Sequence, residues 1–367
     1  MLMKIIHFIS GIGSGGVEQM LINYTGILNK NTDFTQIVVF QHDPDKICLN
    51  KLERAGDKCV RISDKRHHPL KNLWQSYRII KSEQPDIVHC HMSLLNFFPL
   101  FIAWICHVKV RISHSHISSS SNPRFVDWIF KRLNIIFATK LLACGEDAGH
   151  FLYGKSKFKV IRNAINIDNF INIRKKNQDE RRELHIPSDA VVIGHIGRFV
   201  DQKNHGRLLD IFFDYYWNLN RKAYLLLVGD GDLKKEMEIK ADNLGIKNRV
   251  LFTGNVDNVS KYYSVMDVFL LPSLYEGLPI VAIEAQCSGI PMLISNTIDS
   301  DAKILSTTKL LSLNLSNLKW EKNLDRLVHE RKIDFSTIKD ILVQKGFSIE
   351  KEVENLNGFY KQAVEEI

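Results

Sequence analysis

The chain has 367 residues and a formal net charge of +8, and 45% of its residues are hydrophobic, 10% aromatic and 25% charged. This length is sufficient for two α/β domains, and the composition is ordinary for a soluble globular protein. The positive charge suits phosphate-bearing ligands or an anionic membrane surface. It would also suit nucleic acid, but the sequence has no RNA-binding fingerprint, zinc-finger spacing or long basic tail, so we expect no nucleic-acid partner.

The sequence shows no sign of secretion or of a membrane span. Six cysteines are scattered without a Cys-x-x-Cys pair, which indicates reduced thiols in a cytosolic enzyme. Residues 5–9 are apolar apart from His7 but too few for a signal peptide, and they lead directly into a glycine-rich loop. The most apolar segment, residues 94–106, is shorter than a membrane span and contains Pro99, so we expect a buried helix. We therefore expect a cytoplasmic protein.

Strands and helical segments alternate along the chain. We expect strands at residues 4–9, 36–40, 60–62, 87–89, 108–112, 140–143 and 159–161, with helical periodicity at 18–28 and 73–82. After a polar linker and helix within residues 168–186, strands recur at 191–196, 223–228, 250–252, 268–271 and 292–294. Such alternation predicts parallel sheets with right-handed crossovers, so each half is expected to form a Rossmann-like domain, with ligands binding in a cleft between the two.

Residues 275–285 are the most informative segment because they contain two carboxylates. Glu276 lies in the loop after the strand 268–271, and Glu284 lies just over one turn into the next helix, whose first turn suits Pro279. Ligands of open α/β sheets bind at the carboxyl ends of the strands. The free N–H groups of Gly277 and its neighbours, with the helix dipole, favour an anion there. Two acids beside an anion site suit a sugar nucleotide.

Two cations follow the first strand of the second half. Arg198 and Lys203 come after residues 191–196, and a guanidinium and an ammonium in one cleft suit a diphosphate. The alternative is that both are ordinary surface cations, but Gly197 before them and the glutamate pair downstream favour the functional interpretation.

Glycines and histidines mark strand ends in the first half. Residues 11–16 satisfy Gly-x-Gly-x-x-Gly, but the second strand is not followed by the acid that a nicotinamide enzyme needs, so we favour a flexible glycine loop lining the cleft. His89 with His91, and His114 with His116, end two other strands. Alternate residues share a strand face, so each pair could mimic a metal site, but we find no third ligand with metal spacing.

Together these motifs resemble the retaining glycosyltransferases of the GT-B type, glycosyltransferase family 4 (group 1). Glu276 and Glu284 match the family's Glu-x7-Glu motif, and residues 197–199 with 202–204 resemble its diphosphate-binding pair. Residues 15–18 resemble its first loop, and the resemblance extends over nearly the whole chain. Residues 111–116, 163–166 and 290–295 resemble most closely the subgroup that builds exopolysaccharide, capsule or lipopolysaccharide.

The resemblance implies a role for each motif residue. Glu276 would contact donor-sugar hydroxyls and Glu284 the nucleotide ribose, and His116, or alternatively His114, would be the cleft histidine near the reacting sugar. The expected catalytic residues are Glu276, His116, Arg198 and Lys203. The expected donor-binding residues are Gly16, Arg198, Lys203, Gly254, Glu276, Gly277, Leu278, Pro279 and Glu284. The residues expected on the acceptor side are Gly15, His91 and His114.

The resemblance also implies a GT-B fold with an N-terminal acceptor domain (residues 1–168), a C-terminal nucleotide-sugar domain (169–347) and a C-terminal helix (348–367) that packs back on the N-terminal domain. In this family cations and helix N-termini replace the metal. We therefore expect no cofactor and no essential metal, despite Asp-x-Asp triplets at 43–45, 230–232 and 299–301. Residues 295–301 lack the glycine-rich loop common in the family, which leaves the donor sugar open.

The expected activity is transfer of a sugar from a nucleoside-diphosphate donor, UDP-linked in most of the family, to a glycan or lipid-linked acceptor. The anomeric configuration would be retained because the acceptor attacks the same face of the sugar from which the leaving group departs. One alternative is a nicotinamide-dependent oxidoreductase, supported only by Gly11, Gly13 and Gly16. The other is a non-catalytic sugar-nucleotide-binding paralogue, which the intact Arg198 and Lys203 disfavour.

Two stretches could place the protein on the inner face of the cell membrane. Residues 65–68 with Lys71 form a basic cluster beside Leu70, Leu73 and Trp74, and residues 125–132 mix aromatic and basic side chains. Interfacial helices show such mixtures. The alternative is that the aromatic side chains belong to the core and the cations are solvated.

Overall fold

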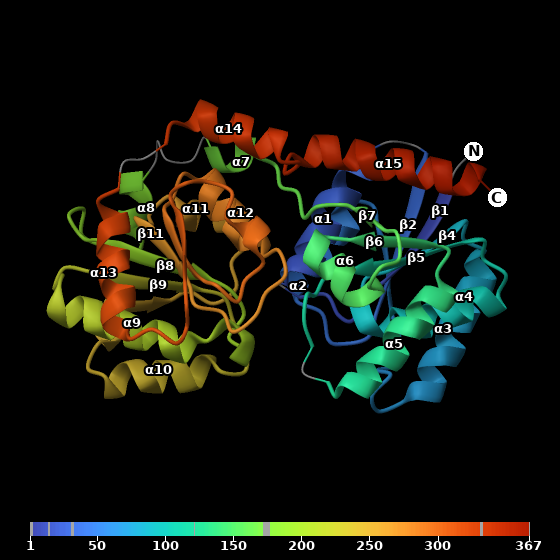
Figure 1. Ribbon diagram of the computed structural model, residues 1–367, viewed down its shortest axis with the longest axis horizontal. Coiled ribbons are helices and arrows are strands. Elements are labelled where there is room, and N and C mark those ends of the chain that lie inside the picture. Colours follow the sequence, from blue (N-terminus) through green and yellow to red (C-terminus); the bar gives the residue numbers. More distant parts are fainter. Residues whose placement is uncertain are drawn as a thin grey trace. The chain divides into compact units, whose positions relative to one another are not determined.

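The computed structural model describes residues 3–13, 15–30, 33–120, 122–171, 177–330 and 333–366. The chain divides into two compact α/β units: unit 1 is Met1–Ala164 with Ile349–Ile367, and unit 2 is Ile165–Ser348. Ser14 of the glycine loop, Ser121 and residues 172–176 of the expected linker lie outside the described residues. Figure 1 labels the helices and strands of each unit.

Unit 1 is built on a parallel sheet with the strand order β3-β2-β1-β4-β5-β6-β7. The strands are β1 (Met3–Phe8), β2 (Phe34–Phe40), β3 (Lys58–Arg61), β4 (Ile87–Cys90), β5 (Val110–Ser115), β6 (Lys140–Ala143) and β7 (Lys159–Val160). The order reverses between β1 and β4, and the carboxyl ends beside such a reversal are where open α/β sheets bind ligands.

Helices cover both faces of the unit 1 sheet (Figure 1). They are α1 (Gly16–Leu28), α2 (Lys46–Arg54), α3 (Pro69–Glu83), the 3-10 helix η1 (Ser93–Asn96), α4 (Phe97–Ile105), α5 (Arg124–Phe137), α6 (Glu146–Tyr153) and α15 (Ile349–Glu365). On one face Ile5, Ile87 and Ile112 pack with side chains of α1 and α15. The alternate residues Ile6 and Phe8 pack with α3 and α4 on the other, as the period of two in a strand requires.

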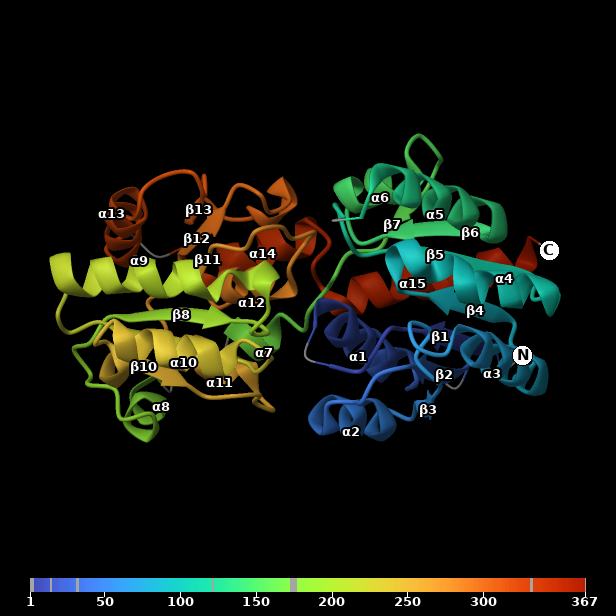
Figure 2. The ribbon, with the colours of Figure 1, turned by 90° about the horizontal axis from the view of Figure 1, so that it is seen from below.

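Unit 2 repeats the architecture with the strand order β10-β9-β8-β11-β12-β13. The strands are β8 (Val192–Ile196), β9 (Tyr224–Val228), β10 (Val250–Phe252), β11 (Val268–Leu271), β12 (Met292–Ser295) and β13 (Thr308–Leu311). The helices are α7 (Asp168–Ile171), α8 (Asn177–Glu183), α9 (His205–Asn218), α10 (Lys234–Asn243), α11 (Val259–Tyr263), α12 (Ile280–Cys287), α13 (Asn317–Val328) and α14 (Phe335–Gln344). Figure 2 shows α9 and α10 lying over this sheet.

The expected fold class is confirmed: both units are parallel, Rossmann-like α/β sheets. Three details differ from the sequence expectation. Strand β13 was not predicted, and the strand expected at 108–112 is shifted to Val110–Ser115, which places His114 inside it. Pro279 precedes α12 as its N-cap residue instead of lying in the first turn. The expected buried helix within residues 94–106 is present as η1 and α4, although Trp104 is half exposed.

In the part of the chain that the structure describes, no helix is both long enough and apolar enough to cross a bilayer.

Candidate active site

The loops after β8, β9 and β10 are tied together at the carboxyl edge of the unit 2 sheet. The main-chain N–H of Gly197 donates to Val228 O at 2.9 Å, and the N–H of Gly229 donates to Gly254 O at 2.9 Å. Gly229 has φ +136°, and a Cβ there would lie 2.2 Å from Gly197 O. Only glycine permits this approach, so the loop that carries Arg198 is held by backbone contacts.

Lys203 and Glu276 form an ion pair at the same edge. Lys203 ends a short 3-10 helix, η3 (Asp201–Lys203), and its Nζ lies 2.5 Å from Glu276 Oε1. Ser273 Oγ donates to the same oxygen at 3.0 Å, and Gln202 Nε2 donates to Oε2 at 3.1 Å. The two charged side chains are only 14% and 9% exposed. The carboxylate is therefore fixed by three donors, as a group that must orient a ligand requires.

Arg198 differs from its neighbours because it is exposed and its guanidinium, among the described residues, has no hydrogen-bond or ion-pair partner. It directly follows Gly197, where a Cβ would lie 3.3 Å from Lys203 Cδ, so this loop passes close to the Lys203–Glu276 pair. A guanidinium that no protein carboxylate neutralises can accept an anionic ligand through two parallel N–H bonds.

Glu284 is buried in α12 and is paired with a tyrosine that the sequence analysis did not identify. The Tyr263 hydroxyl, from α11, donates to Glu284 Oε2 at 2.9 Å, and both side chains are at least 96% buried. Burial, and then the Glu284 charge, raise the pKa of Tyr263 well above its usual value, so the phenol keeps its proton. No signal in the sequence points to this partner, which becomes evident only from the packing of α11 against α12.

The remaining donor-side residues surround the start of α12. Gly277 is half-buried, whereas Leu278 and Pro279 are buried, and Leu278 packs in the hydrophobic core of unit 2. Only the main chain of Leu278 is therefore suited to contact a ligand. Gly254 adopts φ +72° in the loop after β10 and lies next to the Gly229 contact described above.

In unit 1 the glycine loop leads into α1. Gly15 is the N-cap residue of α1, and a Cβ on it would lie 2.4 Å from Glu18 Oε2, so Glu18 folds back against this loop. A Cβ on Gly16, in contrast, would meet nothing within 4 Å. The two positions expected to line the ligand site therefore differ, because only Gly15 is constrained by a neighbouring side chain.

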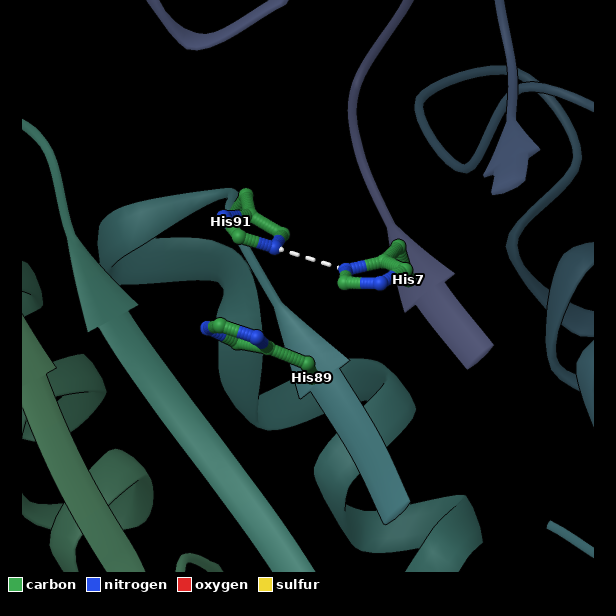
Figure 3. Close-up of side chains that lie close together, drawn as sticks. All are labelled: His7, His89 and His91. Atoms are coloured by element: carbon green, nitrogen blue, oxygen red, sulfur yellow. Dashed lines mark hydrogen bonds between the residues drawn. The ribbon is translucent and has the colours of Figure 1, made fainter. Parts of the chain in front are cut away.

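Five histidines gather at the carboxyl edge of the unit 1 sheet. His7 Nδ1 lies 3.1 Å from His91 Nε2, as Figure 3 shows, and His91 Nδ1 lies 3.1 Å from His116 Nε2. His89 Nε2 lies 3.1 Å from His114 Nδ1. Burial lowers the pKa of all five, to about 4 for His7 and about 3 for His116, so the imidazoles are neutral at pH 7.

The statement that the histidine pairs lack a third ligand was wrong. His7 joins His89 and His91, and His91 joins His114 and His116, with one ring nitrogen from each within 4.8 Å of the others. Spacing along a single strand identifies only ligands on that strand. The third histidine comes from a neighbouring strand, because β1, β4 and β5 are adjacent and His7 lies directly opposite His89.

Known proteins resemble the chain along nearly its whole length. The model described as "Glycosyltransferase Family 4" matches residues 14–169, and "Glycosyl transferases group 1" matches residues 176–306. The putative glycosyltransferase EpsF of Bacillus subtilis strain 168 is 31% identical, over 99% of this chain and 97% of that protein. The Escherichia coli UDP-Gal:alpha-D-GlcNAc-diphosphoundecaprenol alpha-1,3-galactosyltransferase is 28% identical over 62% of each chain.

Among solved structures, HepE of Anabaena in complex with UDP-glucose superposes with a TM-score of 0.83, at 17% identity, over 98% of this chain and 100% of that one. The chain belongs to glycosyltransferase family 4 (group 1), and it has the GT-B fold.

Proposed function

We propose that the chain is a retaining glycosyltransferase that transfers a sugar, from a UDP-linked donor, to a glycan or lipid-linked acceptor in surface polysaccharide biosynthesis. The observation that carries the proposal is the fixed Lys203–Glu276 pair, together with the nearby Arg198 in the loop after β8, whose guanidinium has no partner among the described residues. The E. coli relative, whose name gives a UDP-Gal donor and a diphosphoundecaprenol-linked acceptor, supports this chemistry, as does the UDP-glucose complex of HepE.

Unit 2 would bind the donor. Arg198 and Lys203 would contact the diphosphate, and the N-terminus of α12 would add partial positive charge. Glu276, whose oxygens are already oriented by Ser273 and Gln202, would accept hydrogen bonds from sugar hydroxyls. Glu284 would bind the ribose, with its Oε2 held by Tyr263.

The reaction needs charge stabilisation more than a side-chain base. The bond between the anomeric carbon and the diphosphate oxygen breaks, and the acceptor oxygen forms the new bond on the same face. The departing phosphate takes the acceptor proton. Negative charge grows on the leaving group, and fixed cations stabilise it without reorganisation. This assignment requires no metal and no cofactor.

Unit 1 would contact the acceptor and the reacting sugar. His116 and His114 would serve as neutral hydrogen-bonding groups, because burial keeps their pKa values low. His91, which was expected on the acceptor side, would support them from behind the site, because both of its ring nitrogens are hydrogen-bonded to His7 and His116. Gly15 and Gly16 would line the same side, with the backbone of Gly16 open to a ligand.

A membrane surface is the further partner that we propose, on the face formed by α3, α4 and α5, which Figure 2 shows side by side. Leu73 and Phe130 pack in hydrophobic cores, as the alternative interpretation of these two stretches requires.

Large apolar side chains are nevertheless exposed on all three helices: Leu70, Trp74, Tyr77, Trp104, Ile105, Phe125, Trp128 and Ile136. Arg78 and Arg132 lie over the rings of Trp74 and Trp128, at 4.8 and 5.9 Å. Exposed aromatics with cations favour an anionic lipid surface.

A panel of nucleotide sugars tests the proposed function. Purified protein is incubated with each, and release of the nucleoside diphosphate and protection against heat are measured. We expect one UDP-sugar both to release UDP and to protect the protein against heat. Protection by NADH instead, or binding without release in the presence of bacterial polyprenyl-linked acceptors, would favour the oxidoreductase or the non-catalytic paralogue.

A further inference from the structure

The five histidines at the carboxyl edge of the unit 1 sheet, of which only His116 is half-buried and the others are buried, are joined in two hydrogen-bonded chains. The His116 relay consists of Asn29, Gln36, His7, His91 and His116, and the His114 relay consists of Tyr360, His89 and His114. Each relay ends on a buried ring nitrogen that has no partner among the described residues: His116 Nδ1 and His114 Nε2. A neutral imidazole has one N–H and one lone pair, so the partners of one nitrogen decide what the other offers.

The polarity of the His116 relay is fixed at a backbone carbonyl. Asn29 Nδ2 donates to Ala55 O at 2.9 Å, and a carbonyl can only accept. The oxygen end of the Asn29 amide therefore faces Gln36, whose Nε2 donates to it at 2.7 Å. Gln36 Oε1 is then the acceptor for His7 Nε2 at 2.9 Å, so His7 carries its proton on Nε2.

The same logic continues through two more rings. His7 Nδ1 is a lone pair and accepts from His91 Nε2–H, and His91 Nδ1 accepts in turn from His116 Nε2–H. His116 is thereby left with an unprotonated Nδ1. The free end of this relay is a hydrogen-bond acceptor.

The His114 relay has the opposite free end. The Tyr360 hydroxyl, on α15, lies 2.7 Å from His89 Nδ1, and this is its hydrogen-bond partner among the described residues. If Tyr360 accepted from His89, its own buried O–H would have no acceptor, at a cost of about 1–3 kcal/mol. Tyr360 therefore donates, His89 Nε2–H donates to His114 Nδ1, and His114 presents Nε2–H.

We propose that the two relays preset His116 as an acceptor and His114 as a donor, so that this histidine pair binds one hydroxyl group. The rings lie 4.1 Å apart between centroids, inclined by 31°, and a hydroxyl is the small group that can donate to one nitrogen and accept from the other. Gln36, His7, His91, His89 and Tyr360 are positioning residues that act through this pair. The hydroxyl belongs to water in the free protein and to a sugar in the complex, and the second source rests on the proposed function.

A metal ion is the competing use of these imidazoles. A zinc ion needs three or four lone pairs converging at about 2.0–2.1 Å. Both ring nitrogens of His7, His89 and His91 already have hydrogen-bond partners at 2.7–3.1 Å, so a metal among these three would break at least one chain. The hydrogen-bonded arrangement accounts for all but the two terminal nitrogens, so we favour it.

Nitrogen-15 NMR of the full chain, labelled in histidine, reads the protonation of each ring nitrogen directly and needs no substrate. Single His→Gln variants assign the signals. We expect five neutral Nε2–H tautomers at pH 7. Protonated Nδ1 in His116 or His114 would overturn the proposal, as would one bound zinc per chain after purification and dialysis.

Two variants test whether the relays are independent. Each removes the residue that fixes the tautomers of one relay and leaves the other relay intact. Gln36→Leu should move the His116 Nδ1 signal towards the protonated position and leave His114 unchanged, whereas Tyr360→Phe should change His114 and leave His116 unchanged. General loosening of the fold would move both, and that result would contradict two independent relays. If either variant fails to fold, the wild-type spectrum still decides the polarity.

Ligand addition separates the two hydroxyl sources. A change at His116 Nδ1 on adding UDP-glucose but not UDP means a sugar hydroxyl, and no change with either means water. In a transfer assay Gln36→Leu should lower kcat about 10-fold, within the loss of up to about 10²-fold that misplacement of a positioned group can cause. Absence of transfer with every nucleotide sugar would refute the proposed function and leave the tautomer result standing.

Discussion

The Lys203 ammonium lies 2.5 Å from a carboxylate oxygen of Glu276, and both side chains are largely buried at the carboxyl edge of the unit 2 sheet. Neither charge can therefore be removed without consequence for the other. Arg198, in the same loop, is exposed and has no such partner among the described residues. Two cations expected to share one task therefore differ in what they contribute to folding.

We predict that Arg198→Ala and Lys203→Ala each lower turnover at least about 10²-fold, the order seen when charge stabilisation is removed. Arg198→Ala should leave the free energy of unfolding unchanged, whereas Lys203→Ala should lower it because Glu276 loses a charged partner. Steady-state kinetics and denaturant titration measure the two effects. Near-normal turnover in both folded variants would remove these residues from the diphosphate site.

The two glutamates should separate nucleotide binding from sugar transfer. Glu284→Gln is expected to weaken binding of UDP, because its proposed partner is the ribose, while Glu276→Gln should leave UDP binding nearly intact and lower transfer. Tyr263→Phe, which removes the 2.9 Å hydrogen bond to Glu284, should resemble a mild form of Glu284→Gln. Calorimetry with UDP compares the three; the reverse pattern would exchange the roles.

Transfer activity should persist in excess EDTA, because cations and the start of α12 are proposed to stabilise the leaving group. The assay compares initial rates before and after chelation. Complete loss that manganese or magnesium restores would contradict this proposal. Asp299, Asp301 and the unit 1 histidines would then be the candidate metal ligands.

Stability should fall as the pH drops below about 6.5. In the unfolded chain a histidine takes up its proton near its usual pKa of 6.5, but folded His7 does so only near 4. Between these values the unfolded state binds more protons, so each such histidine lowers the free energy of unfolding by about 1.4 kcal/mol per pH unit. His7→Gln should give a shallower slope, and the exposed His329→Gln should not. Equal slopes in all three proteins would contradict burial as the cause.

Most of the fold could be predicted because strand positions follow from short apolar runs between turn residues. β13 (Thr308–Leu311) was not predicted because its side chains are mostly half-buried and Lys309 interrupts the apolar pattern. The shift of β5 to Val110–Ser115 has a related cause. His114 and Ser115 read as a polar loop in sequence, but they are fully buried in a hydrogen-bonded network.

The candidate site was only partly predictable, because contacts between distant segments carry much of it. Glu276 and Lys203 were identified by spacing and resemblance, but their ion pair joins residues 73 positions apart. Tyr263 and His7 gave no local signal. Each acquires a role only when packing sets it beside Glu284 or opposite His89.

The membrane proposal predicts salt-sensitive binding to anionic liposomes and none to neutral ones, because each basic residue near the surface contributes about 1 kcal/mol. Combined Trp74→Ala and Trp128→Ala should weaken sedimentation with anionic liposomes. Trp217→Ala is the matched control, since this tryptophan is also exposed but lies on α9 of unit 2. If the wild-type protein bound neither kind of liposome, the membrane proposal would be wrong, and only phosphate-bearing ligands would account for the positive charge.

The central claim is that unit 2 binds a nucleoside diphosphate through Arg198, and titration calorimetry with UDP tests it most directly. We predict that the wild-type chain binds UDP and that Arg198→Ala binds it about 10–100-fold more weakly, as loss of a charge-assisted contact implies. Arg221→Ala, which removes an arginine stacked 3.4 Å over Trp217, should bind like the wild type. Absence of UDP binding by the wild-type chain, or equal affinity in all three proteins, would contradict the account.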